Sequence, residues 1–126
     1  MKRIIAAVLL LAASFTGAFI LNYMTIKKIN KVSDKLEIIA EAADNASAQE
    51  LLIMAEDLIC EWKRNDWMVH ATINKDTLID AEKSIEMLPY LAKAELKDDF
   101  KIYCIEAYGK INSIGKSEKI NSENIF

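Results

Sequence analysis

An almost unbroken apolar run near the N-terminus constrains this chain more than any other feature. After Lys2 and Arg3, the residues from Ile4 to Leu21 are apolar with few exceptions, and the run trails off at Met24. As a helix, the segment from Ile4 to Met24 would be about 31 Å long at 1.5 Å per residue, and the hydrocarbon core of a bilayer is about 30 Å thick. The run is therefore long enough to cross a membrane once.

Two interpretations of this run are open, a retained anchor and a cleaved signal peptide. The sequence Thr16-Gly17-Ala18 resembles a small-x-small cleavage site. However, the apolar run continues through Phe19, Ile20 and Leu21, so a cut after Ala18 would leave a hydrophobic N-terminus. We therefore favour a retained anchor, which predicts a single-pass protein of the cell membrane.

The orientation of such an anchor depends on the charges beside it. Lys2 and Arg3 on one side are balanced by Lys27, Lys28 and Lys31 on the other, so the positive-inside rule does not decide the orientation. A short segment before the run and a much longer body after it are typical of a signal anchor whose N-terminus stays inside. We expect the body to be extracytoplasmic.

The body after the anchor has the composition of one small helical domain. The chain of 126 residues contains three glycines and one proline, and it is rich in good helix formers. The formal net charge is −3, and because Lys2 and Arg3 lie in the anchor, the body alone carries −5. A domain that binds nucleic acid is expected to present a basic face. We therefore expect an all-α fold and no nucleic-acid partner.

Apolar residues at helical spacing predict that the anchor helix continues without a break to about Asp44 and that three further helices follow. Ser47 and Glu50 form a capping box that opens the second helix. Its end is ambiguous, because Asn65-Asp66 could stop it or it could continue to His70. The residues expected to point inward are Ile29, Val32, Leu36, Ile39, Ala43, Leu51, Ala55, Leu58, Trp62, Ile73, Thr77, Ala81, Ile85, Leu88, Leu96, Phe100, Tyr103, Ala107 and Ile111.

The ends of the last two helices are predicted from Pro89 and Gly115. A third helix is expected from Thr72 to Met87, with Pro89 as its stop, and a fourth is expected to begin between Ala92 and Leu96 and to end at Gly115. Short connections favour an antiparallel up-down bundle of about four helices. The chain then divides into a membrane anchor, 1–24, a helical bundle, 25–115, and a C-terminal tail, 116–126.

No arrangement of reactive residues predicts an enzyme. Cys60 and Cys104 lie in different predicted helices and match no metal or redox spacing. They are either two free thiols or, if the body is outside and the helices are neighbours, one disulfide. One histidine and scattered carboxylates make neither a zinc nor a calcium site. We expect no catalytic residue, no metal and no cofactor.

Both tryptophans and the single histidine form a cluster of interest. Trp62, Trp67 and His70 fall within nine residues, and Asp66 precedes His70 by four. If this stretch is helical, Asp66 and His70 share a face, and the carboxylate favours the charged imidazole. One interpretation is structural, with both tryptophans in the core. The other is a surface that binds a partner or a ligand.

The spacing of Trp62 and Trp67, followed by His70 and Ile73, resembles a known family when it is taken together with the single anchor and the ending Asn124-Ile125-Phe126. That family consists of small, N-terminally anchored helical proteins of unknown function from spore-forming, Gram-positive anaerobes. Its members are often encoded beside a multi-pass membrane protein. The resemblance therefore implies a membrane partner.

Two functions are compatible with these features. The first is a membrane-tethered interaction module that docks a membrane protein through the cluster or through the C-terminal residues. The second is a sensor-like domain that binds a small ligand of unknown identity or responds to pH. We prefer the first, since no cytoplasmic signalling domain is evident. Its candidate surface consists of Trp62, Asp66, Trp67, His70, Ile125 and Phe126.

Overall fold

A computed structural model describes the backbone of residues 1–64 and 66–125, and the side chains of residues 1–64 and 66–117. Within these residues the protein is all-α, as predicted, and it contains no strand. The helices are α1 (Lys2–Ala42), α2 (Ala48–Lys63), α3 (Asp66–Thr72), α4 (Lys75–Lys93) and α5 (Lys97–Ile125).

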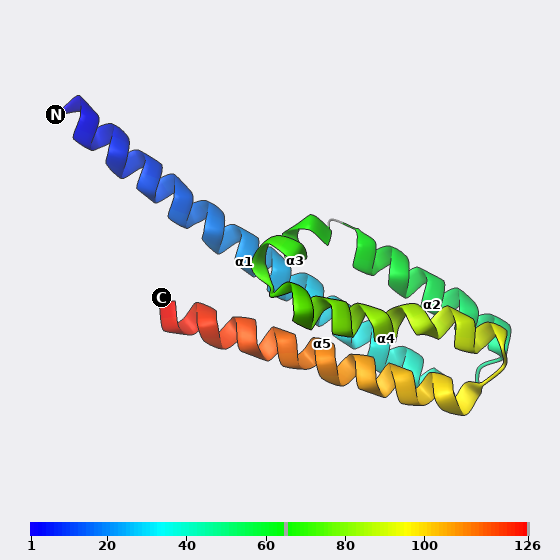
Figure 1. Ribbon diagram of the computed structural model, residues 1–126. Helices are drawn as coiled ribbons and strands as arrows, with labels where there is room; N and C mark the ends of the chain where they lie inside the picture. The colour runs from blue at the N-terminus through cyan, green and yellow to red at the C-terminus, as the bar shows by residue number, and fades with distance from the viewer. Residues whose placement is uncertain (65, 126) are drawn as a thin grey trace.

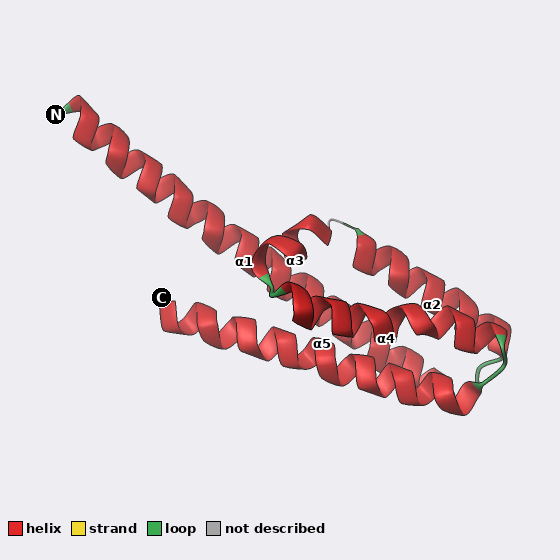
Figure 2. Ribbon diagram, viewed as in Figure 1, coloured by secondary structure: helices red, strands yellow, loops and turns green. Residues whose placement is uncertain are grey.

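The four long helices form an antiparallel up-down bundle (Figures 1 and 2). Both α2 and α5 pack against α1 and against α4, so α2 and α5 lie on opposite sides of the bundle. The short helix α3 contacts α1 and lies at the end of the bundle from which the N-terminal half of α1 projects. We call this the exit end. Because α5 runs antiparallel to α1, its C-terminal end extends past α3 on the side where the N-terminal half of α1 projects.

The prediction that one helix joins the apolar run to the bundle is confirmed. α1 is continuous over 41 residues, and among the described residues it alone is long and apolar enough to cross a membrane. The apolar window is exposed, with none of its residues buried in the protein, as in an anchor or a signal sequence. Burial begins at Thr25, and Ile29, Val32 and Leu36 are completely buried.

Most of the predicted inward residues form the core. Thr77 and Leu96 do not, because both are exposed. In α4 the inward stripe is instead set by Leu78, Ala81 and Ile85, which place Thr77 one residue off the buried face. Leu96 precedes the first residue of α5 and lies in the connection between helices.

The ambiguous end of the second helix is resolved by a break. α2 begins at the predicted cap, where the Ser47 hydroxyl accepts a hydrogen bond from the Glu50 N–H (3.2 Å), and it ends at Lys63. The backbone of Arg64 is extended, and α3 follows as a separate helix that includes His70 and ends at Thr72. The next helix therefore begins later than predicted, at Lys75.

Pro89 does not stop the helix that contains it. α4 continues through Pro89 to Lys93, so the predicted end near Met87 is wrong. Proline has no N–H, and the carbonyl of Ile85 therefore receives no hydrogen bond from residue 89. The turn after the proline is held instead by burial of Leu91 and Ala92 in the core.

Gly115 is not a helix end either. α5 continues past it to Ile125, so most of the predicted tail, 116–126, is helical, and Phe126 lies outside the described residues. Gly115 is buried where α5 crosses α1: a Cβ atom at this position would lie 3.0 Å from Cγ2 of Ile29. The absence of a side chain permits this close approach of the two helices.

Substitution of the two glycines of α5 by alanine tests this contact. Gly109 is exposed with nothing within 4 Å of an added Cβ, so Gly109→Ala should raise the free energy of unfolding. We expect a gain of about 0.5–1 kcal/mol, the usual difference between alanine and glycine inside a helix. Gly115→Ala should not show this gain, because Ile29 must move. Chemical denaturation of the full-length protein in detergent, followed by circular dichroism, measures both. Equal stabilisation by the two substitutions would contradict the close packing of α5 on α1.

Candidate functional site

α3 is fixed to α1 at the point where the apolar run ends. The hydroxyl oxygens of Thr25 and Thr72 lie 3.1 Å apart, and both hydroxyls lie within hydrogen-bonding distance of the Met68 carbonyl, at 3.4 and 2.9 Å. Thr25 is completely buried and immediately follows Met24, the last residue of the run. These contacts hold α3 at the level where α1 leaves the bundle.

Trp62, one of the candidate surface residues, belongs to the core. Its side chain is 5% exposed, and its indole Nε1–H donates a hydrogen bond to Oε1 of Glu82 (3.2 Å). The ammonium of Lys28 lies 5.9 Å from the centre of the Trp62 ring. The structural interpretation therefore applies to Trp62, which is not available to a partner.

Lys28 has a structural role that sequence reasoning missed. It is buried, and its ammonium donates a hydrogen bond to the carbonyl of Arg64, the residue that caps the C-terminus of α2. Burial lowers the pKa of Lys28 below its ordinary value. The sequence marks Lys28 only as a charge flanking the apolar run, although its helical spacing from Thr25 and Val32 places it on the buried face.

The other three residues of the predicted cluster lie together on α3. Trp67 is 62% exposed. Nε2 of His70 lies 3.8 Å from Oδ2 of Asp66, and 3.5 Å from Oε1 of Glu82. The same Glu82 oxygen accepts the hydrogen bond of Trp62, so this carboxylate of α4 connects α2 with α3. No sequence signal pointed to Glu82, since it is separated from His70 by a helix boundary.

The two remaining candidates lie at the C-terminal end of the chain. Ile125 and Phe126 lie outside the residues whose side chains are described. Among the described residues, no group of three histidine, cysteine, aspartate or glutamate side chains is placed to hold a metal ion.

The two cysteines are both free. Cys60 is exposed on α2, whereas Cys104 is buried on α5, on the opposite side of the bundle. The disulfide considered from the sequence is therefore not formed. Burial raises the pKa of the Cys104 thiol to about 12, which keeps it protonated and unreactive at neutral pH.

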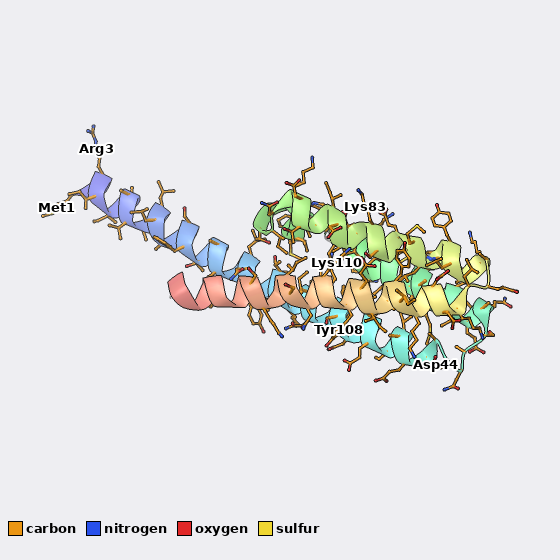
Figure 3. The ribbon with its side chains drawn as sticks, turned by 60° about the horizontal axis from the view of Figure 1, so that its bottom comes forward. Met1, Arg3, Asp44, Lys83, Tyr108 and Lys110 are labelled. Carbon is orange, nitrogen blue, oxygen red and sulfur yellow. The ribbon has the colours of Figure 1, made fainter. Side chains whose placement is uncertain are left out.

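α5 presents a second surface, an outward ridge with a groove on each side. Figure 3 shows this face, with Tyr108 on the side of α5 toward α1 and Lys110 on the side toward α4. Ile105 lines both grooves and is 55% exposed. The groove toward α4 is crossed by Lys110, whose ammonium pairs with Asp80 (3.3 Å) and Glu106 (3.0 Å).

The groove between α1 and α5 is lined by both apolar and acidic side chains. Its cavity has a volume of about 380 Å³. Ala40, Ile105 and Tyr108 supply the apolar lining, and the charged lining residues are Glu37, Glu41, Asp44 and Lys101. Lys101 pairs with Asp44 (2.7 Å), and among the described residues neither glutamate forms an ion pair. We call this the acidic groove.

Comparisons with known proteins identify no relative. No family model, no curated protein and no solved structure matches the chain. The family resemblance noted in the sequence stays a prediction, and the assignment of function rests on the geometry described above.

Proposed function

We propose that the protein is a membrane-tethered helical interaction module that docks a membrane protein. The observation that carries the proposal is the continuity of α1, which passes from the apolar run into the core without a break. A bundle attached in this way is held at a fixed distance from the bilayer. Its surface can therefore meet the same part of a membrane protein each time.

This proposal requires that the apolar run is retained as an anchor. The helix has no break at Ala18, where a signal peptidase would cut, and the apolar run continues through Leu21. Leu21 and Asn22 are already half-buried by the rest of the protein. A cut after Ala18 would therefore leave an apolar stub fixed to the bundle, which supports retention.

The acidic groove is the surface best suited to a protein partner. A groove between two helices accepts the apolar face of a third helix. Here Ile105 and Tyr108 supply apolar lining, and the carboxylates of Glu37 and Glu41, which form no ion pair among the described residues, favour a basic partner. We propose that the groove binds an amphipathic segment of a membrane protein that carries both apolar and basic side chains.

A matched pair of isoleucine substitutions tests this docking site. Ile105→Glu should abolish co-purification of the partner from gently solubilised membranes, because it places a carboxylate among the apolar and acidic side chains that line the groove. Ile53→Glu is the control, since Ile53 is 60% exposed on α2, away from the groove. Retention of the same membrane protein by wild type and Ile105→Glu would contradict the assignment.

The proposed extracytoplasmic position of the body can be tested with the native cysteines. In intact cells, a membrane-impermeant maleimide should label Cys60, which is exposed, and leave Cys104 unlabelled because it is buried and protonated. One label per chain is therefore expected, and none in Cys60→Ala. Labelling of the wild-type protein only after lysis would place the body in the cytoplasm.

The alternative function, a pH-responsive sensor, is favoured by one observation. His70 lies within 4 Å of two carboxylates, those of Asp66 and Glu82. However, the His70 and Asp66 side chains are about half-exposed. Solvent-exposed ion pairs typically contribute about 0–1 kcal/mol, which is little for a switch. The interaction module therefore remains our preferred function.

A further inference from the structure

We infer that α3 is a membrane-contacting element, in which Trp67 enters the interfacial region of the bilayer and the basic residues around it face anionic lipid headgroups. The inference rests on the retained anchor of the proposed function. It assigns lipid, rather than a protein, to the exposed part of the cluster predicted from the sequence.

The position of α3 relative to the apolar run is the first argument. The Thr25 hydroxyl contacts the carbonyl of Met68, the residue that follows Trp67. Thr25 in turn follows Met24, the last residue of the run. If the run fills the hydrocarbon core, α3 lies at the level where α1 leaves it (Figure 1), and Trp67 of α3 lies next to the headgroups.

The chemistry of the exposed side chain is the second argument. Tryptophan is enriched at membrane–water interfaces, because its ring is apolar and its N–H can bond to water or headgroups. Trp67 is 62% exposed although it is one of the two largest side chains in the protein. Tyr23, on α1 two residues before Thr25, is 61% exposed at nearly the same level. The two rings together have the placement of an interfacial aromatic belt.

The third argument is the distribution of charge along the bundle. The Lys31–Glu61 ion pair (3.1 Å) and the contact between Gly115 and Ile29 place these parts of α1, α2 and α5 at one level. The hydrogen bond of Trp62 and the contact of His70 place Glu82 of α4 there as well. Residues 25–31, 61–64, 66–82 and 113–117 therefore form the exit end, within about two helical turns of Thr25.

These segments are basic, and the part of the bundle farther from the apolar run is acidic. The exit end contains seven lysine or arginine residues and five aspartate or glutamate residues, a net charge of +2. Residues 32–60 and 83–112, which make up the rest of the bundle, contain six basic and twelve acidic residues, a net charge of −6. An anionic lipid surface attracts basic residues within about one Debye length and repels acidic ones. Both effects turn the exit end, and with it Trp67, toward the membrane.

Quenching of tryptophan fluorescence by brominated lipids tests the inference. The full-length protein is reconstituted into phosphatidylcholine vesicles whose acyl chains carry bromine close to the headgroup. Wild-type fluorescence should be quenched through Trp67. Trp67→Phe retains only Trp62, which is buried in the protein, and its fluorescence should show no quenching. Inclusion of phosphatidylglycerol should increase the quenching of the wild type.

The matched control moves the exposed tryptophan to the opposite end of the bundle. Tyr90 is 67% exposed in the C-terminal half of α4, far from the exit end, so the double variant Trp67→Phe, Tyr90→Trp should show no quenching. Equal quenching of wild type and Trp67→Phe, or quenching in neither, would overturn the inference. Absence of quenching in pure lipid would leave a protein as the partner of Trp67.

The same preparation separates this inference from the proposed function. If the chain does not float with the vesicles in a density gradient, the run is not a retained anchor and the proposed function fails before any fluorescence is measured. If the chain floats and Trp67 is not quenched, the run still inserts into the bilayer and only the lipid contact of α3 is wrong.

Discussion

The close packing of α1 within the bundle, immediately after the apolar run, is the constraint on which the rest of the structure depends. Ile29 is completely buried and meets the backbone of α5 at Gly115, while Lys28 donates to the C-terminal carbonyl of α2. Thr25 joins α3 to the same short stretch. Three helices are thus attached to α1 within five residues, so a change in the direction of α1 would move the whole bundle.

This attachment places the two proposed surfaces at different levels along α1. Trp67 lies at the level of Thr25, whereas Ala40 in the acidic groove follows Thr25 by fifteen residues, or about 22 Å of helix. The basic exit end would face lipid, and the acidic groove would face the aqueous side. A membrane protein that binds in the groove would therefore have to extend well beyond the lipid headgroups.

Helical periodicity predicted the elements that depend on burial alone, including the continuity of α1 and the cap at Ser47. It failed where tertiary packing overrides local preference. The helix continues beyond Pro89 because Leu91 and Ala92 are buried after it, and Gly115 provides space for Ile29 rather than a helix end. Spacing also could not separate Trp62, which is buried, from Trp67, which is exposed, because α2 ends and α3 begins between them.

The central claim, that α1 connects the membrane to the bundle without a hinge, is tested most directly by amide hydrogen exchange. The full-length protein in lipid nanodiscs should show slow exchange for every amide from Met24 to Lys31, because α1 is one hydrogen-bonded helix across this stretch and is packed against α3 and α5. Fast exchange confined to these residues, with protection on both sides, would reveal a flexible joint and contradict the account.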